Sequence, residues 1–291
     1  MNAKQEVQSS DPLAPRSSWE GSLDLVYRRE GQQTQISHCY HQAPFNLQRP
    51  FYPEGPQVCH TVALHTAGGV VGGDRLSIQI ALQPQTHVLL TTAAASKIYR
   101  SNGQEARQSI NFQIQADAML EWLPLETILF DQADYRQDLH IDLEPGAIYS
   151  GWEITRLGRS ARGEKFLSGS WRSNTEIWQQ QQPLWIDRQR LSGGTEQWHS
   201  PHGLAAQPVV ASFVWVGEAV DLSQVSAARL LWQTNPENLG DIGVTRLQLG
   251  LLCRYRGFSS QAARQWFIQV WNLMRLARLG RRACLPRVWP I

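Results

Sequence analysis

The stretch Ser109-Ile110-Asn111-Phe112-Gln113-Ile114-Gln115 alternates strictly between polar and apolar side chains. Successive side chains of a β-strand point to opposite faces, so this period of two puts every apolar member on one face. The same alternation is found in residues 76–80 and 139–143. Each segment is therefore predicted to be a strand with one face in a core.

Turn signals separate the strand-like segments that run from about Leu23 to Val216. Many short strands with regular turns predict a sandwich, a barrel or a β-solenoid. We find no convincing internal repeat, so the sequence does not by itself select a regular solenoid. The turn signals are Gly72-Gly73-Asp74, Asn102-Gly103, Pro145-Gly146 and Gly193-Gly194.

The pattern changes after Asp221. Residues 222–233 are a helix candidate, residues 244–255 a strand candidate, and a clearer helix follows. Ser259 or Ser260 can cap the start of that helix, and Gly280 suits its end. Its apolar side chains recur at i, i+3 and i+4 and form one stripe: Ala263, Trp266, Phe267, Val270, Trp271, Met274 and Ala277.

This apolar stripe is expected to pack on the β-body, and the alternative is that part of it stays open for a partner protein. The side chains expected largely off the stripe are Arg264, Gln265, Asn272, Arg275 and Arg278. If part of this region meets a partner, the candidate contacts are Trp266, Trp271, Arg275 and Arg287.

The composition is that of a folded domain. Of 291 residues, 42% are hydrophobic and 18% charged, which allows a real core and argues against global disorder. Tryptophan occurs 12 times, which suits large interior layers or a sizeable interface. The net charge of +2 gives no sign of nucleic-acid binding. One basic cluster near the end is either a solvated helix face or a docking surface for an acidic partner: Arg275, Arg278, Arg281, Arg282 and Arg287.

The cysteines and the N-terminal residues bear on the compartment. Cys39, Cys59, Cys253 and Cys284 form no C-x-x-C pair, which is typical of reduced thiols. Residues 1–16 are polar and aperiodic, and we interpret them as a disordered leader without a secretory signal. No run approaches the roughly 18 apolar residues of a spanning helix. We therefore expect a cytoplasmic protein that does not enter a membrane.

Signatures of catalysis are missing. Gly158-Arg159-Ser160 is followed by Ala161-Arg162, which breaks the nucleophile elbow. Residues 68–74 are rich in glycine but lack the Lys-Ser/Thr of a phosphate cradle. The densest group of potential metal ligands is His38-Cys39-Tyr40-His41. Such ligands could hold a soft or borderline metal, although a structural histidine is commoner. The candidate ligands are Cys39, His41, Cys59 and His60.

Two segments are too specific to be generic loops. Gly68-Gly69-Val70-Val71-Gly72-Gly73-Asp74 needs permissive backbone angles or the close approach of another chain segment. Residues 90–100 (Leu-Thr-Thr-Ala-Ala-Ala-Ser-Lys-Ile-Tyr-Arg) carry small and hydroxylated side chains that would line a narrow polar passage.

These segments belong to a set of motifs that resembles the ordered motifs of the UreD/UreH urease accessory proteins, from about Trp19 to the end. Two departures affect details of the C-terminal surface: Trp271-Asn272-Leu273 stands where the family commonly has Arg-Pro after the tryptophan, and Pro290-Ile291 differs from the usual ending. The motifs are Arg49-Pro50-Phe51-Tyr52-Pro53-Glu54, Gly68 to Asp74, Ser96-Lys97-Ile98-Tyr99-Arg100, Leu120 to Pro124, Leu157-Gly158-Arg159 and Pro286-Arg287-Val288-Trp289.

The resemblance implies a mainly β fold. The body would be two-layered and β-helix-like, built of many short strands, with a small C-terminal α/β portion carrying about two helices. Residues 17–291 would form a single domain, with the β-body at about 17–220 and the helical part at about 221–291.

It also implies a urease maturation factor with no catalytic activity of its own. The protein would bind UreF, and through UreF the GTPase UreG, with two copies in the accessory complex. That complex would dock on apo-urease and deliver nickel, with UreE as the upstream source. The chain would hold no stable cofactor and would bind Ni²⁺ only transiently.

A water-filled passage for the metal through the β-body is implied as well. The positions matching its polar lining are Asp74, Ser96, Lys97, Glu153, Glu164 and Asp187. Structural roles are the alternatives: Asp74 as a turn cap, and Lys97 as the counter-ion of a carboxylate. The other two inward candidates, Glu153 and Asp187, could form ion pairs with Arg159 or Arg188.

Two other functions remain open at this point. A pure assembly chaperone would reshape apo-urease without contacting nickel. A polysaccharide-cleaving enzyme would use paired carboxylates on a solenoid-like body, although such proteins are usually secreted. A continuous polar channel past Asp74, Glu153 and Asp187 would favour nickel transfer, and a glycan-cleavage assay would test the enzyme.

Overall fold

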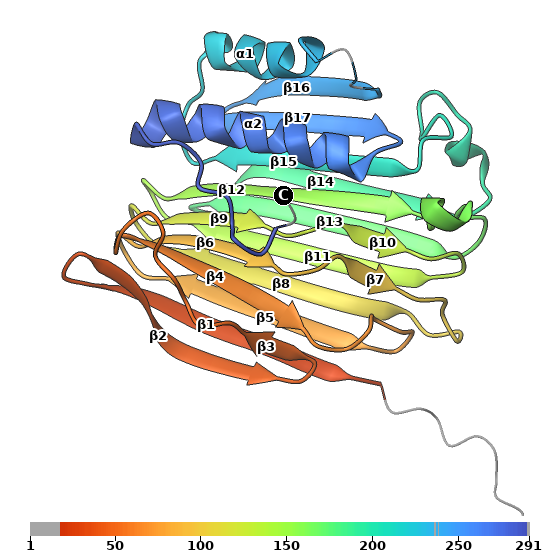
Figure 1. Cartoon of the computed structure of the whole chain (residues 1–291), viewed down its shortest axis with the longest axis horizontal. Helices are drawn as coiled ribbons and strands as arrows, with labels where there is room; N and C mark the ends of the chain where they lie inside the picture. The colour runs from red at the N-terminus through yellow and green to blue at the C-terminus, as the bar shows by residue number, and fades with distance from the viewer. Residues whose placement is uncertain (1–17, 236, 238, 290–291) are drawn as a thin grey trace, which may run out of the picture.

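The computed structural model describes residues 18–235, 237 and 239–289, so the expected leader at residues 1–16 lies outside the described part of the chain. Two β-sheets pack face to face (Figure 1). Sheet A has the strand order β14-β13-β11-β8-β5-β1-β2. Its strands are β1 (Glu20–Glu30), β2 (Gln33–Gln42), β5 (Arg75–Leu82), β8 (Ala106–Ile114), β11 (Asp134–Leu143), β13 (Ser170–Gln179) and β14 (Gln182–Ser192).

Sheet B has the order β16-β17-β15-β12-β9-β6-β4-β3, with the short strands β7 (Ser96–Ile98) and β10 (Thr127–Leu129) beside it. Its other strands are β3 (Phe45–Leu47), β4 (Val58–His65), β6 (His87–Thr92), β9 (Met119–Leu123), β12 (Ile148–Leu157), β15 (Val209–Val216), β16 (Asp241–Leu247) and β17 (Gly250–Gly257).

The chain winds between the two sheets. It passes from β5 to β6, from β8 to β9 and from β11 to β12, crossing from sheet A to sheet B each time. Strands of successive turns pair in parallel, as β5, β8 and β11 do in sheet A. The prediction of a mainly β, two-layered, β-helix-like fold is confirmed.

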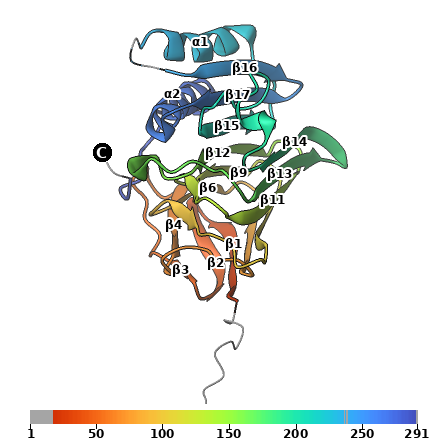
Figure 2. The same cartoon turned by 90° about the vertical axis from the view of Figure 1, so that its right-hand side faces the viewer.

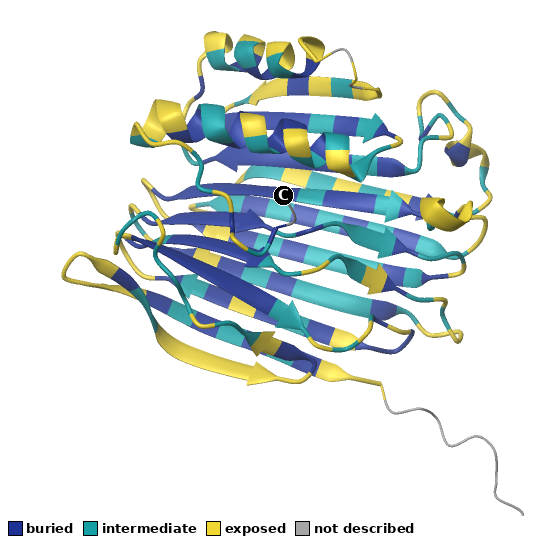
Figure 3. Cartoon of the chain, viewed as in Figure 1, coloured by how far each residue is buried: buried dark blue, intermediate teal, exposed yellow. Residues whose placement is uncertain are grey.

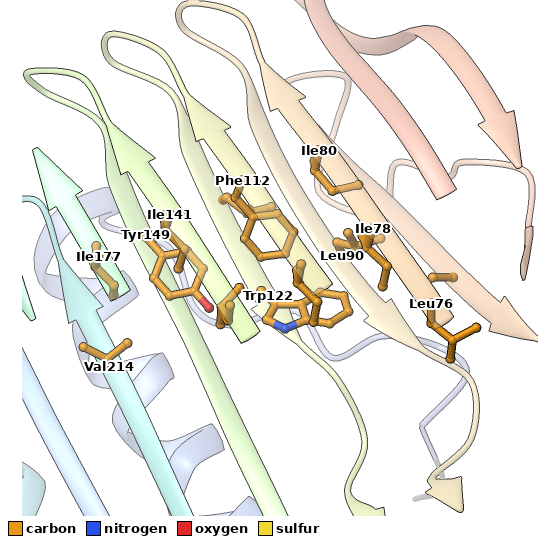
Figure 4. Close-up of a cluster of buried hydrophobic side chains, with 14 of the residues drawn as sticks. Leu76, Ile78, Ile80, Leu90, Phe112, Trp122, Ile141, Tyr149, Ile177 and Val214 are labelled. Atoms are coloured by element: carbon orange, nitrogen blue, oxygen red, sulfur yellow. The ribbon is translucent and has the colours of Figure 1, made fainter. Parts of the chain in front are cut away.

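The core between the sheets is built by the predicted alternation. Ile110, Phe112 and Ile114 of β8 are all buried, and their polar neighbours face outwards. Phe112 meets Trp122 of sheet B edge-on, with ring centroids 5.7 Å apart. Figure 4 shows this apolar layer running from β5 to β15. Burying each large apolar side chain contributes about 1.5–3 kcal/mol, so this layer holds the two sheets together.

A second core lies on the outer face of sheet B, under the helices α1 (Leu222–Gln233) and α2 (Ser260–Leu279) (Figure 2). The Ser259 hydroxyl accepts a bond from the Ala262 amide, and Gly280 ends α2 with φ of 63°, as expected. Half of the tryptophans belong to this second core, so the large interior layer accounts for much of their abundance. They are Trp152, Trp215, Trp232, Trp266, Trp271 and Trp289.

The C-terminal part differs from expectation in two places. The strand expected at 244–255 is a hairpin of β16 and β17, because Gln248 and Leu249 form a tight turn without a Gly or Asn signal. This hairpin extends sheet B through β15. In α2 the buried stripe stops at Met274, Ala277 is exposed, and Arg275 is buried although it was expected off the stripe.

Figure 3 shows that exposure is concentrated on the outer faces, the helix surfaces and strand β2. Neither helix of the described chain is both long enough and apolar enough to cross a membrane.

Candidate functional site: a cavity between the sheets

A cavity of about 480 Å³ lies between the sheets, beside the core. Two of the predicted segments line it: Gly68 to Val70, and Ala93 to Lys97. The remaining polar lining comes from strands of both sheets and from the loop after β4, and consists of His65, Thr66, Thr92, Gln108, Thr127, Gln137, Glu153 and Thr155. The cavity thus brings together polar side chains from positions 65 to 155, and Ser96, Lys97 and Glu153 are among them.

The two segments meet because the glycines allow close approach. A Cβ on Gly69 would lie 2.6 Å from the Lys97 carbonyl oxygen, and the Val70 amide donates to that same carbonyl at 2.8 Å. The close approach predicted from the glycine-rich sequence is therefore present.

Glu153 points from β12 into the space between the sheets. Its carboxylate accepts hydrogen bonds from the Gln137 amide and the Ser173 hydroxyl of sheet A. Protein surrounds it, yet part of its surface is accessible because it faces the cavity. Burial raises its pKa to about 7, the nearby Asp187 adds to the rise, and the Ser173 hydrogen bond opposes it. No cation of the described chain pairs with it, which leaves the carboxylate available.

Asp187 lies beyond Glu153 on β14. Its carboxylate accepts from Arg254 at 2.8 Å and from Gln189 at 2.7 Å. Arg254 also donates to the hydroxyl of Ser212, the residue of β15 that lies opposite Glu153 in sheet B. Asp187 is therefore ion-paired as the structural alternative foresaw, but with Arg254 and not with Arg188 or Arg159.

A narrow gap continues from the cavity past Glu153. It has a volume of about 10 Å³, which is roughly the space of one water, and both Glu153 and Ser212 line it. Ser212 and Arg254 also line a second, more open hollow of about 690 Å³ between β14 and the β15–β17 strands. Glu153 thus lines the cavity and the narrow gap, while Ser212 lines the gap and the second hollow, so the gap lies between the two.

Asp74 is not among the cavity's lining residues. One of its oxygens accepts from the Trp19 amide and the other from the Val71 amide, both at 2.9 Å. It therefore acts as the turn cap named as its alternative, and it fixes the glycine-rich loop that does line the cavity.

Glu164 and Lys97 have different surroundings. The Glu164 carboxylate binds the Arg159 guanidinium through two bonds of 2.7 Å, in a surface loop away from the cavity. Lys97 is exposed at the cavity wall and has no carboxylate partner within the described ranges. The counter-ion role for Lys97 is thus not seen in this structure.

His65 is a lining residue that sequence reasoning missed. One ring nitrogen, Nδ1, lies 3.3 Å from the Ala67 carbonyl, while Nε2 is buried with no hydrogen-bond partner. Burial lowers its pKa, so the ring stays neutral at pH 7. A neutral imidazole with a free lone pair is a ligand for nickel or zinc. Its position just before the glycine-rich motif is the signal that could have found it.

The four candidate metal ligands do not gather into one site. Cys39 and His41 are exposed on the edge strand β2, whereas Cys59 points into the core between the sheets. His60 binds Glu54 at 2.8 Å on the other face of β4. The described residues do bring Glu54, His60 and Cys284 within 4.8 Å of one another, but Glu54 already pairs with Arg275.

Three of the four candidate partner contacts lie inside the fold. Trp266, Trp271 and Arg275 are at most 1% exposed, so a partner cannot reach them in this conformation. They are buried because α2 turns their face onto sheet B. Arg287 is exposed and lies over the Phe51 ring at 4.5 Å.

A buried ion network explains the position of Arg275. Its guanidinium pairs with Glu54 at 2.8 Å and with Glu121 at 3.2 Å, and Glu121 also accepts from Trp271 and His87. Burial alone would raise the pKa of Glu121, but His87 and the Arg275 cation hold it below its usual value. The network joins two motifs of the resemblance, because Glu54 and Glu121 both bind Arg275, which also donates to the Arg282 carbonyl oxygen.

The raised pKa of Glu153 gives a testable pH dependence of stability. An unfolded glutamate titrates near about 4.3, so between that value and about 7 the folded chain binds more protons than the unfolded chain. The free energy of unfolding must then fall as pH rises through this window. We expect Glu153→Gln to be more stable than wild type by about 1–3 kcal/mol at pH 8, with no gain at pH 4.

Urea denaturation at both pH values measures this difference. Asp142→Asn, which removes an exposed carboxylate on the outer face of sheet A, is the matched control and should show no such gain. An equal effect of Glu153→Gln at pH 4 and pH 8 would contradict the assignment of the raised pKa.

The fold and the cavity define a class: helically wound, two-layered β-proteins with titratable side chains among the residues that line a cavity between the sheets. The family model for the UreD urease accessory protein matches residues 20–290. A UreD from Acaryochloris marina is 62% identical over 99% of this chain and 100% of its own length. UreD proteins from Nostoc punctiforme and a Synechocystis species are 60% and 41% identical, over 94% and 90% of this chain and 96% and 97% of their own lengths.

The chain belongs to the UreD urease accessory protein family. The resemblance drawn from the motifs is thereby confirmed. Proteins of this family are accessory factors in urease maturation and not enzymes, so the polysaccharide-cleaving alternative is wrong.

Proposed function

We propose that this protein passes nickel through the cavity between its sheets towards apo-urease, as the cargo of a complex with UreF and the GTPase UreG. The supporting observation is Glu153, an inward carboxylate that has no cation partner in the described chain and lies where the cavity meets the narrow gap. Ser96 and His65 line the same cavity and offer a hydroxyl and a neutral imidazole.

The chemistry of these groups suits a metal in transit. Ni²⁺ accepts imidazole, carboxylate and water, and it would displace the proton from Glu153 near pH 7 as the carboxylate binds. The ligands are scattered along the cavity, and a scattered set binds more weakly than a closed site with many ligands. With an association rate of about 10⁶ M⁻¹s⁻¹ and a micromolar Kd, release takes roughly a second; with a nanomolar Kd it takes many minutes.

The partners and compartment remain part of the proposal. The protein would act in the cytoplasm, with UreE as the upstream nickel source and two copies of this chain in the accessory complex. Any UreF surface must use exposed groups such as Arg287, because Trp266 and Trp271 are inside the fold. Asp74 would contribute by holding the glycine-rich wall, and Asp187 by its charge near Glu153.

Replacement of Glu153 by Ala tests the proposal. Removing the central carboxylate should lower the urease activity reached after maturation, while the complex with UreF, measured by pull-down, stays intact. Asp142→Ala, on the outer face of sheet A, is the control and should leave activity unchanged.

The pure assembly chaperone is the competing function. It needs no metal ligand in the cavity, so full urease activity with Glu153→Ala, at equal UreF binding, would favour it and overturn nickel passage.

A further inference from the structure

Five arginines form a row across the outer face of sheet A. They occupy matching positions on adjacent strands, as the strand register pairs Arg75 with Arg107, Arg107 with Arg136, Arg136 with Arg172, and Arg172 with Arg190. We call these five residues the arginine row. Their strands β5, β8, β11, β13 and β14 are consecutive neighbours in sheet A (Figure 1).

The side chains of the row share the outer face. The residues next to them in sequence, such as Leu76, Tyr135 and Trp171, are buried in the core between the sheets, so the alternation turns the arginines outwards. Arg107 and Arg136 both bind Asp138, which confirms that they lie on one side. At about 4.8 Å between strands, the row is about 19 Å long.

The positive charge of the row is only partly compensated. The Asp138 carboxylate forms ion pairs with both Arg107 and Arg136, and Arg75 donates to the Glu105 carbonyl oxygen. Arg172 and Arg190 make no hydrogen bond or ion pair within the described part of the chain. The Nε atoms of Arg107 and Arg172 are buried without a partner.

Such a row costs stability, because like charges directly opposite each other in a sheet repel. The arginines at the C-terminus differ: Arg275 is buried, Arg278 pairs with Glu218, and Arg281 binds Gln57. The arginines of the outer sheet are therefore a second candidate surface for an acidic partner, beside the exposed arginines of the C-terminal cluster.

We propose that the arginine row is a docking site for a carboxylate-rich segment of a partner protein. Guanidinium groups bind carboxylates through paired N–H donors, and a row of them fits acidic side chains presented along an extended segment. The face also carries Asp138 and Glu176, beside a groove of about 430 Å³. These carboxylates would repel the dense phosphates of a nucleic acid, whereas a protein segment can offer donors to them. The proposal does not depend on nickel passage.

Binding of a fluorescein-labelled deca-glutamate peptide, followed by fluorescence anisotropy at low salt, tests the site. The double variant R172Q/R190Q removes the two arginines without partners and should weaken binding about tenfold or more, because charge-assisted bonds are lost. The matched control R281Q/R282Q removes the same charge from exposed positions of the C-terminal tail and should stay within about twofold of wild type, because only long-range attraction changes.

A structural role for the row predicts a different result. If the arginine row serves binding and does not stabilise the fold, R172Q/R190Q relieves repulsion between like charges, and the midpoint of thermal unfolding should not fall. A lower midpoint, equal losses of affinity in both double variants, or absence of peptide binding to wild type would overturn the proposal. Tighter binding of a 20-base-pair DNA duplex than of the peptide would replace the protein partner by a nucleic acid and overturn it as well.

Discussion

Arg275→Ala is expected to destabilise the folded chain by about 3–5 kcal/mol, since removing one member of a buried ion network leaves its two carboxylate partners buried without the arginine cation. Arg275 is fully buried between Glu54 and Glu121 and also donates to the Arg282 carbonyl oxygen. The substitution would therefore remove the cation that pairs with the Glu54 and Glu121 carboxylates. It would also remove the hydrogen bond that holds the tail after α2 at the Arg282 carbonyl oxygen. Urea denaturation at pH 7 measures the loss.

The control is Arg278→Ala, one turn closer to the end of the same helix. Arg278 pairs with Glu218 while half exposed, and such surface pairs contribute about 0–1 kcal/mol. The pKa values of Glu54 and Glu121 are held below their usual range, so their contribution is present above the unfolded pKa and is lost in acid. The difference in the free energy of unfolding between Arg275→Ala and wild type should therefore become smaller below about pH 4. Equal losses for the two arginine variants would contradict the network.

Ser96→Trp is expected to have the largest effect on function. The indole would project into a cavity of about 480 Å³ and obstruct it, and transport through a narrow pore depends steeply on its open diameter. We expect the rate of urease activation to fall about tenfold or more, as for an occluded pore. Gln113→Trp adds the same side chain on the exposed outer face of β8 and should leave activation unchanged.

Thermal unfolding and UreF pull-down separate obstruction from misfolding. Overpacking a filled core costs about 1–3 kcal/mol, but an indole that enters an existing cavity should cost less. Normal activation by a folded Ser96→Trp protein would show that the cavity is not used.

Local patterns predicted much of this structure. The alternation in residues 109–115 identified a strand and its buried face, and the stripe and caps identified α2, because period and capping depend on neighbours in sequence. The hairpin of β16 and β17 was missed because its two-residue turn carries no glycine or asparagine.

Contacts between distant segments could not be predicted in the same way. Arg275 reaches Glu54 across 221 positions, and the helical pattern indicated neither its burial nor its partner. The arginine row depends on the register of five strands, which no single segment encodes. Among the passage candidates, Ser96, Lys97 and Glu153 line the cavity, whereas Asp74 caps a turn, a role its position after two glycines already allowed.

In the proposed function, nickel reaches urease through the cavity beside Glu153. The most direct test counts nickel ions per urease active site after maturation with wild type, Ser96→Trp, Glu153→Ala and the control Gln113→Trp, at matched UreF binding. Nickel passage predicts nickel-poor urease with both cavity variants and full loading with the control. Full loading with all three variants would contradict the claim and leave the protein a role in assembly alone.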